Sequence, residues 1–410
     1  MRKCNIGLVL SLSRYGGGTY QWTINILHVL EDYRKAHPEE IQIHIFCPTQ
    51  NKDNKDNKDN EDNEEIRRVF PCFQSNQVSK VAIFFTKAII KIFIAMPFLL
   101  FFLRYIFPLN FIAAKKKVDL MIFPGASFDA ALYWGEQIFM FTDIAHIFYP
   151  HFPEVSSNGE LRRRHLLFNY GIKQATQVVV DSNQLRLDVG EYYHANLSKI
   201  NVLYQTRSQT LNFDDNSDDC VQFKNILPKK YLFYPAQLWE HKNHKNLLLA
   251  MKIVLEADND VFLILSGAKK EGSEKIFSLI ENLNIPKNVK YLGYVTDQFM
   301  PILYKNALML VMPTYFGPTN IPTLEAFYFG CPAVISDLPG VREQTGKAAL
   351  LFDPDSPEDI ANKIQLVLQD KTRREEMVKM GYERMKLFSY EKYRTDLFSI
   401  LDKSLKIGVE

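Results

Sequence analysis

Short apolar runs alternate with helical stretches through the second half of the chain, and no other feature limits the fold as strongly. Each run is three to six residues long, as a buried strand would be. The runs occupy residues 231–234, 261–266, 289–292, 308–312, 333–335 and 350–352. Strands that alternate with helices form parallel sheets covered by helices. Residues 230–385 are therefore predicted to form a doubly wound, Rossmann-like α/β domain.

A second series of the same kind opens the chain. Residues 6–12 are apolar, three glycines follow at 16–18, and the residues from Trp22 to Tyr33 have helical spacing. Further apolar runs lie at residues 41–47, 118–123, 139–141 and 177–180. Strand, glycine loop and helix in this order begin a doubly wound domain, so residues 1–210 are predicted to form one. Two such domains in tandem place a ligand in the central cleft that they face.

The glycine loop at 16–18 has two interpretations. It does not match G-x-G-x-x-G, and the chain has no G-x-x-x-x-G-K-[ST], so neither the dinucleotide fingerprint nor the P-loop is present. Glycines let a backbone approach a ligand closely, but a plain tight turn uses them equally well.

Three further segments complete the domain organisation. Residues 50–66 are almost entirely Asn, Lys, Asp and Glu, so they cannot bury apolar surface and should form a mobile insertion. Residues 211–229 begin with an acidic, polar run and are expected to be the interdomain linker. Residues 386–410 are expected to form a C-terminal helix, with packing against the N-terminal domain as one arrangement.

Charge and cysteine content limit the partners and the compartment. The net charge of +2 gives no bias toward nucleic acid, and no zinc-ligand spacing occurs. The five cysteines are odd in number and form no C-x-x-C pair, which favours a reducing compartment. The apolar part of residues 1–10 is too short for a signal peptide. We therefore expect a cytoplasmic protein, either free or at the inner face of the cell membrane.

Residues 81–114 are the most apolar part of the chain. Their longest uncharged piece, residues 92–103, has 12 residues, against about 20 needed to span a bilayer. Lys87, Lys91 and Arg104 flank or interrupt it. One hypothesis is a helix pair that dips into one leaflet as a peripheral membrane contact, and the other is a buried helix of the N-terminal domain.

Residues 313–327 follow the apolar run 308–312 and break it with turn-forming residues. Pro322 suits the first position of a helix, because its missing N–H has no partner there. The free N–H groups of such a helix start attract phosphates. Glu325 is expected in the first helical turn, where it either complements the helix dipole or accepts hydrogen bonds from ligand hydroxyls.

Two other groups are candidates for the same chemistry. Lys242 lies between a strand and a helix, where it can reach a diphosphate at the Pro322 helix and hold it without metal. Asp143 and His146 follow the apolar run 139–141, at the strand edge where ligands bind in open α/β sheets. A structural role for this histidine is equally open. Two Asp-x-Asp triplets, at 258–260 and 353–355, are expected to be turns and caps rather than metal ligands.

Several stretches carry a family resemblance. The most specific are Pro-Ala-Gln-Leu-Trp-Glu-His-Lys-Asn-His at 235–244 and Thr-Asn-Ile-Pro-Thr-Leu-Glu-Ala-Phe at 319–327. Weaker matches are the glycines at 16–18, residues 142–146, residues 336–340 with Glu343, and residues 350–354. In these stretches the chain resembles a bacterial branch of the retaining GT-B glycosyltransferases of family 4.

The resemblance implies a nucleotide-sugar donor, a glycan or lipid-linked acceptor, and no metal or other cofactor. Lys242 would bind the donor diphosphate, Glu325 the ribose hydroxyls, and Tyr294 would lie near the base. The full donor-binding set that it implies is Gly17, Gly18, Gln237, Lys242, Tyr294, Thr319, Asn320, Ile321 and Glu325. The catalytic residues that it implies are Asp143, His146 and Asn320.

Two positions depart from the family pattern. Members often carry a glutamate eight positions before the one matched by Glu325, where this chain has Gly317. They also often have arginine five positions before the matched lysine, where this chain has Gln237. The missing glutamate motivates two alternatives: a donor-phosphate oxygen acting as the base, or a non-catalytic scaffold that binds a nucleotide or glycan.

Overall fold

The computed structural model describes residues 3–10, 18–48, 69–209, 211, 217–317 and 320–406. The expected insertion at 50–66 and the glycines at 16 and 17 lie outside these residues. The chain forms two compact units. The first unit comprises residues 1–151, 155–204 and 393–410, and the second comprises residues 152–154 and 205–392. Apart from residues 152–154, the chain passes between the units at 204/205 and 392/393, six and seven residues from the predicted boundaries at 210 and 386.

The first unit contains a seven-stranded parallel sheet in the order β3-β2-β1-β4-β5-β6-β7. Its strands are β1 Cys4–Val9, β2 Ile41–Pro48, β3 Gln74–Val78, β4 Leu120–Pro124, β5 Gln137–Met140, β6 Gln177–Val180 and β7 Ile200–Val202. In the register, Ile6 of β1 pairs with Ile43 and Leu120. The two strands that the sequence did not predict, β3 and β7, are the edge strands. A strand at an edge is less completely covered, so it can lack the apolar run that marks a central strand.

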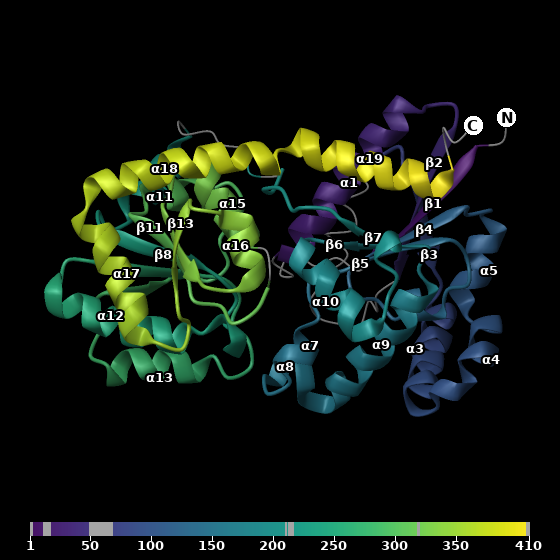
Figure 1. Ribbon diagram of the computed structural model, residues 1–410, viewed down its shortest axis with the longest axis horizontal. Coiled ribbons are helices and arrows are strands. Elements are labelled where there is room, and N and C mark those ends of the chain that lie inside the picture. The colour runs from purple at the N-terminus through teal and green to yellow at the C-terminus, as the bar shows by residue number, and fades with distance from the viewer. Residues whose placement is uncertain are drawn as a thin grey trace. The chain divides into compact units, whose positions relative to one another are not determined.

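Helices cover this sheet (Figure 1). The described α-helices (α) and 3-10 helices (η) before residue 205 are α1 Gly18–Ala36, α3 Lys80–Ala95, η2 Pro97–Leu99, α4 Leu100–Tyr105, α5 Pro108–Lys115, α6 Asp129–Leu132, α7 Ala145–Phe148, α8 Pro153–Ser156, η3 Ser157–Gly159, α9 Glu160–Gln174, α10 Asn183–Tyr193 and η4 Leu197–Lys199. Helix α1 buries Trp22, Ile26, Val29 and Tyr33. The helical spacing predicted after the glycine loop is therefore confirmed.

The C-terminal helix α19, Tyr390–Leu405, forms hydrogen bonds with other parts of the first unit. The Tyr33 hydroxyl donates a 2.6 Å hydrogen bond to Asp402 Oδ1. Lys403 Nζ donates to the carbonyl of Ser198 at 3.2 Å. The expected return of this helix to the N-terminal domain agrees with these contacts.

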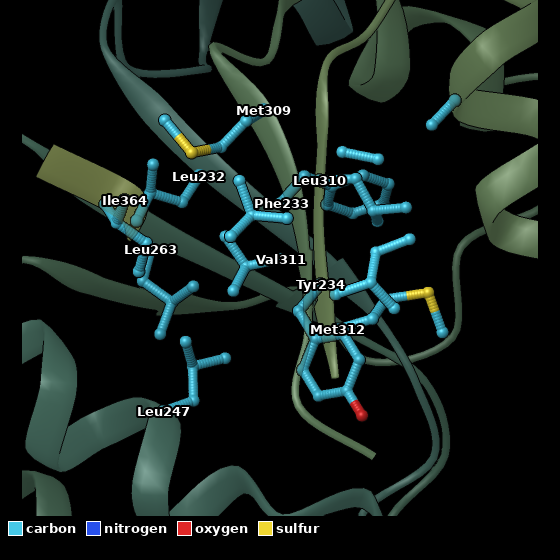
Figure 2. Packing of buried hydrophobic residues seen from close by; sticks show 14 of the residues in the cluster. Leu232, Phe233, Tyr234, Leu247, Leu263, Met309, Leu310, Val311, Met312 and Ile364 are labelled. Atoms are coloured by element: carbon cyan, nitrogen blue, oxygen red, sulfur yellow. The ribbon is translucent and has the colours of Figure 1, made fainter. Parts of the chain in front are cut away.

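The second unit contains a six-stranded parallel sheet in the order β10-β9-β8-β11-β12-β13. Its strands are β8 Tyr231–Pro235, β9 Phe262–Ser266, β10 Val289–Tyr291, β11 Met309–Met312, β12 Ala333–Ser336 and β13 Ala349–Phe352. Numbered within the unit, this is the 3-2-1-4-5-6 order of a doubly wound nucleotide-binding sheet. Figure 2 shows its core, where side chains of β8, β9 and β11 pack beside Leu247 and Ile364. All six predicted strands are confirmed.

Helices lie on both faces of the second sheet. The described helices and 3-10 helices of this unit are α11 Asp218–Asn225, η5 Glu240–Lys242, α12 His244–Ala257, α13 Glu274–Asn282, α14 Met300–Asn306, α15 Ile321–Tyr328, α16 Pro339–Thr345, α17 Pro357–Gln369, α18 Lys371–Met385 and η6 Lys386–Phe388. Figure 1 shows α12 and α17 on one side of the sheet, and α15 and α16 on the other. Both faces are covered, which explains why nearly every residue of its central strands is buried.

The predicted linker at 211–229 is wrong. Leu211 belongs to the core of the second unit, Cys220 is buried, and Ser217 caps helix α11 by accepting a hydrogen bond from the Cys220 N–H. The acidic residues that suggested a solvated linker include Asp218 and Asp219, which occupy the first turn of α11. Negative charge at a helix N-terminus is stabilising, so acidity there marks a helix start rather than a linker.

The apolar segment 81–114 contributes to the core of the first unit. Ile89, Phe93, Leu103 and Phe107 are buried there. Within the described residues, the stretch Pro97–Lys115 is long and apolar enough to cross a membrane by length and composition, with mean hydropathy 1.6 and 33% buried. It is divided into η2, α4 and α5 rather than forming one straight helix.

Candidate nucleotide-sugar site

The two loops that the sequence singled out follow neighbouring strands of the second sheet. Residues 236–243 follow β8, and residues 313–320 follow β11. These strands are paired, and the order of the sheet reverses between them. In open α/β sheets, ligands bind outside the carboxyl ends of the strands at such a switch point.

The loop after β8 is held by its own side chains. Gln237 Oε1 accepts a 2.7 Å hydrogen bond from Trp239 Nε1, and the carbonyl of Lys242 accepts one from the Tyr234 hydroxyl at 2.8 Å. Asn243 has φ 56°, and its side chain caps α12. The backbone around Lys242 is therefore fixed at the end of a short 3-10 turn, next to the start of a helix.

The two loops are joined through the backbone of His241. Its carbonyl accepts hydrogen bonds from the Tyr315 N–H at 2.9 Å and from Thr314 Oγ1 at 3.3 Å. Its ring stacks on Phe316, with centroids 4.0 Å apart. The structure thus brings the residue beside Lys242 into contact with the loop that leads to α15, and the role of Lys242 toward a diphosphate stays a prediction.

Asn320 precedes α15 and is held by a reciprocal pair of hydrogen bonds. Its N–H donates to Gln344 Oε1 at 3.0 Å, and Gln344 Nε2 donates back to its carbonyl at 3.1 Å. The Asn320 side chain makes no capping bond to the helix and instead approaches the Gly317 carbonyl at 3.4 Å. Ile321 is the first helical residue. Thr319, also predicted here, lies outside the described residues.

Glu325 lies one turn deeper than expected. Because α15 begins at Ile321, its first turn contains no acidic residue, so the prediction that Glu325 lies in the first turn is wrong. The residue is 6% exposed, and its carboxylate accepts a 2.7 Å hydrogen bond from the Tyr304 hydroxyl. Burial raises its pKa to about 7, against the opposing effect of the Tyr304 hydrogen bond. A partner inside the fold and a raised pKa distinguish it from a solvated glutamate that only complements the dipole.

Tyr294 follows β10 and Gly293, and 41% of its surface is exposed. An exposed aromatic ring near the strand ends could stack on a base. Its role as a base contact stays a prediction.

The other predicted residues belong to the first unit. Gly18 is the exposed first residue of α1, and Gly17 lies outside the described residues. Asp143 follows β5, accepts a 3.0 Å hydrogen bond from the Ala145 N–H, and pairs with Arg164 at 3.5 Å. Its side chain is 32% exposed, so it stays within reach of a ligand.

His146 is a buried residue, only 1% exposed. Its Nε2 lies 2.9 Å from the Tyr193 hydroxyl, and its ring stacks on Phe168. Burial, with smaller effects from His165 and Arg164, lowers its pKa to about 3. A histidine that is neutral at pH 7 and closed to solvent suits packing better than proton transfer, so the structural alternative is favoured. A catalytic role for His146 stays a prediction.

The two Asp-x-Asp triplets form turns. Asp258 Oδ1 accepts a 3.1 Å hydrogen bond from the Asp260 N–H, and Asp353 Oδ1 accepts one at 2.9 Å from the Asp355 N–H. Asp258 also caps α12. The predicted turns are confirmed for both triplets, and the predicted cap is confirmed for the first. Across the described ranges, no group of three or more His, Cys, Asp or Glu side chains is arranged to hold a metal ion.

Known proteins resemble both the sequence and the fold. Residues 218–384 match the family model described as glycosyl transferases group 1. O-antigen chain mannosyltransferase B of Escherichia coli is 29% identical over 227 residues, which are 53% of this chain and 60% of that protein. O-antigen chain mannosyltransferase RfbU of Salmonella typhimurium is 24% identical over 50% of this chain and 54% of that protein. The chain thus spans 60% or less of the length of these curated relatives.

Solved structures match over almost the whole chain. Sucrose-phosphate synthase from Thermosynechococcus elongatus has a TM-score of 0.74 at 16% identity, over 98% of this chain and 99% of that one. HepE from Anabaena, in complex with UDP and glucose, has a TM-score of 0.70 at 14% identity, over 98% and 100% of the two chains. The fold is GT-B. It consists of two Rossmann-like domains, as the sequence predicted.

Gly317 has a backbone that explains one departure from the family pattern. Its φ is 107°, a conformation that side chains with a Cβ rarely adopt. An added Cβ would meet only Asn320 Oδ1, at 3.6 Å, so conformation rather than space restricts this position. A glutamate at 317 would strain the loop in its present form.

Sequence reasoning missed four residues that shape the site. Tyr304 binds Glu325, Gln344 binds Asn320, and Glu154 binds His241. Gly267, after β9, has φ 137°, and a Cβ there would lie 2.3 Å from the Ala236 carbonyl oxygen. Only Gly267 had a signal in the sequence, as a glycine directly after an apolar run. The other three are linked to their partners only by the tertiary fold.

Proposed function

We propose that the protein is a glycosyltransferase that transfers a sugar from a nucleoside-diphosphate sugar to a glycan or lipid-linked acceptor, with retention of anomeric configuration and without a metal ion. The observation that supports this most is the pair of loops joined through His241 at the switch point of the second sheet. A loop lysine beside a helix start is suited to hold a diphosphate. The GT-B fold and the similarity to mannosyltransferases support the same class of reaction.

Each donor-side residue has a distinct role in this proposal. Lys242 neutralises the diphosphate, together with the Ile321 N–H group at the start of α15. Glu325, in its ionised form, accepts hydrogen bonds from the ribose hydroxyls, and Tyr294 stacks on the base. Gln237 takes the place of the family's arginine and contributes no charge, which leaves Lys242 as the main cation toward the diphosphate.

The reaction breaks the bond between the anomeric carbon and the donor phosphate oxygen. The acceptor hydroxyl oxygen forms the new bond on the same face, and its proton passes to an oxygen of the departing diphosphate. Gly317 supplies no carboxylate near the anomeric carbon, so catalysis rests on positioning and on stabilising the leaving group. Asn320 and Thr319 would add hydrogen bonds to the sugar, and Asp143 would orient the acceptor.

The five cysteines without a C-x-x-C pair favour a cytoplasmic location. A lipid-linked acceptor would require contact with the inner face of the cell membrane. A small soluble acceptor is the alternative within the same enzyme class.

A thermal-shift screen against UDP, GDP, ADP and their nucleosides, followed by a donor hydrolysis assay, tests the proposal. A bound ligand raises the melting temperature by mass action, so one diphosphate should stabilise the protein well above its nucleoside. Slow release of free sugar from the matching donor would support catalysis. Binding without hydrolysis or transfer would favour the alternative of a non-catalytic scaffold, which Gly317 motivates. No stabilisation by any diphosphate would overturn the proposal.

A further inference from the structure

Exposed apolar side chains are concentrated on one part of the first unit. Of the 25 large hydrophobic side chains that are exposed in the described residues, twelve lie between positions 81 and 134. We call these twelve the apolar surface: Val81, Phe84, Phe85, Ile92, Met96, Phe98, Phe101, Phe102, Tyr105, Ile106, Phe111 and Trp134. Phe98, Phe84, Phe102 and Phe101 are 77, 69, 67 and 64% exposed. A concentration of this kind marks a binding face rather than scattered surface residues.

Ring contacts join the part of this surface that lies on α4, α5 and the turn after α6. Phe101 and Tyr105 of α4 lie 5.1 Å apart between ring centroids, and Tyr105 lies 5.7 Å from Trp134, which follows α6. Trp134 in turn lies 6.4 Å from Phe111 of α5. One row of exposed aromatic rings thus joins α4, α5 and the turn after α6.

The same helices are firmly packed on their other side. Phe93, Leu103 and Phe107 are buried in the core of the first unit. Arg104 donates two hydrogen bonds to the Ala131 carbonyl, at 2.8 and 3.2 Å. The exposed aromatic residues therefore stand on a rigid base and are not a loose hydrophobic stretch awaiting a place in the core.

The positive charge around the apolar surface favours an anionic lipid surface over a second copy of this chain as its partner. Residues 80–117 contain seven Lys or Arg and no Asp or Glu. Lys87 and Lys91 lie exposed on α3, beside Phe84 and Phe85 in the sequence. Two copies of such a positive surface would repel each other, whereas an anionic lipid surface would attract it. Tyrosine and tryptophan also favour the boundary between lipid and water.

The local fold favours an in-plane contact over a membrane crossing. A spanning helix needs about 20 continuous residues, whereas α4 has 6 and α5 has 8. Pro97 and Pro108 begin new helical elements, and the Arg104 contacts with Ala131 hold α4 against the first unit. Short helices with one face packed and the other apolar lie in the interface plane.

We propose that the apolar surface docks in one leaflet of an anionic lipid bilayer, with its aromatic rings in the acyl boundary and Lys87 and Lys91 at the headgroups. The protein would then be a monotopic membrane protein that is bound through its first unit. Delivery of a lipid-linked acceptor by this contact rests on the proposed function, but the lipid binding itself does not.

Co-sedimentation of the full chain with vesicles tests the proposal. We expect binding to phosphatidylcholine vesicles that contain 30% phosphatidylglycerol, and weaker binding to phosphatidylcholine alone. The double variant F98S/F102S should bind at least tenfold more weakly, because two of the most exposed rings are lost. K87E/K91E should lose roughly fivefold per lysine in anionic vesicles, the equivalent of about 1 kcal/mol each, and the loss should shrink in high salt.

A matched control replaces two exposed apolar residues outside the apolar surface, as L187S/I226S. These residues are 54 and 59% exposed, and their loss should leave vesicle binding unchanged. The melting temperature of each variant, with and without a nucleoside diphosphate, reports on folding and donor binding separately from lipid binding. No sedimentation with either vesicle, or a dimer in light scattering that F98S/F102S dissolves, would overturn the proposal.

Discussion

One carboxylate oxygen of Glu154 pairs with His241 twice: it accepts a 2.8 Å hydrogen bond from the backbone N–H and also contacts ring Nδ1. Glu154 belongs to the three residues, 152–154, that lie with the second unit although the chain around them belongs to the first. The His241 carbonyl in turn binds the Tyr315 N–H. Glu154 is therefore a positioning residue for the loop that carries Lys242.

Replacing Glu154 by alanine should leave the His241 N–H and ring without this partner. We expect a loss of about 1–3 kcal/mol in the free energy of unfolding, measured by urea denaturation. Glu240→Ala, at an exposed neighbour on the same turn, should change it little. Equal effects of the two variants would show that the Glu154 contact contributes nothing special.

The same pair predicts a pH dependence. Burial tends to raise the pKa of Glu154, but the His241 side-chain and backbone hydrogen bonds outweigh it and lower the pKa below its ordinary value. A carboxylate with a lowered folded pKa contributes stability above its unfolded pKa, near 4.3, and loses it as the pH falls through the folded pKa. The stability difference between the wild type and Glu154→Gln should therefore shrink only below about pH 4.3. A difference that is constant down to pH 3 would contradict this.

Lys242→Ala should weaken nucleoside diphosphate binding by roughly 1.5–3 kcal/mol, the scale of a hydrogen bond to a charged group. Titration calorimetry with the best diphosphate from the thermal-shift screen measures this loss. Binding of the unphosphorylated nucleoside should hardly change. Lys245→Ala removes an exposed lysine three residues away and serves as the control. Equal loss for the diphosphate and the nucleoside would mean that Lys242 only supports the fold.

Glu325 should lower the stability of the protein as the pH rises toward neutrality. Its folded pKa of about 7 lies above the unfolded value near 4.3, so it stabilises the fold most when protonated. Relative to Glu325→Gln, the wild type should lose up to about 3 kcal/mol between pH 4.5 and 7, since one pKa unit equals about 1.4 kcal/mol. Tyr304→Phe removes the opposing hydrogen bond and should extend this loss to higher pH. Parallel pH profiles for the wild type and Glu325→Gln would refute the assignment.

Chelation should leave donor binding and hydrolysis intact. Both Asp-x-Asp triplets use their first carboxylates to hold turns, and among the described residues no group of three His, Cys, Asp or Glu is arranged to hold a metal ion. The assay compares activity in EDTA with activity after adding Mn²⁺ or Mg²⁺. Complete loss in EDTA that either metal restores would overturn the metal-free proposal.

Gly317→Ala should cost about 1–3 kcal/mol of stability, because φ 107° is strained for any residue with a Cβ. Gly18→Ala is the control, since nothing lies within 4 Å of its added Cβ. Gly317→Glu should be destabilised to a similar degree and should not raise donor hydrolysis. Higher activity with unchanged stability would show that the loop accepts the family's glutamate without strain.

The pattern of apolar residues was sufficient to predict a strand where the strand is buried on both faces. The central strands of both sheets are buried on both faces, so each left an apolar run that the sequence displays. The edge strands β3 and β7 left none, because an edge strand is less completely covered, whereas the edge strands β10 and β13 of the second sheet kept an apolar run. The acidic start of α11 was mistaken for a linker, because the same carboxylates suit both a solvated segment and a helix N-terminus.

The two Rossmann-like domains, the two loops after β8 and β11, and the residues that resemble a donor site could all be predicted from the sequence, because each depends on neighbours along the chain. The side chains that hold those loops could be identified only from the fold. Glu154 meets His241 across 87 residues, and Gln344 meets Asn320 across 24. Such contacts leave no periodicity in the sequence, since they arise from the path of the chain between strands. The exposure of Phe98 and the burial of His146 also follow only from the fold. The residue type does not indicate whether a distant part of the chain covers the side chain.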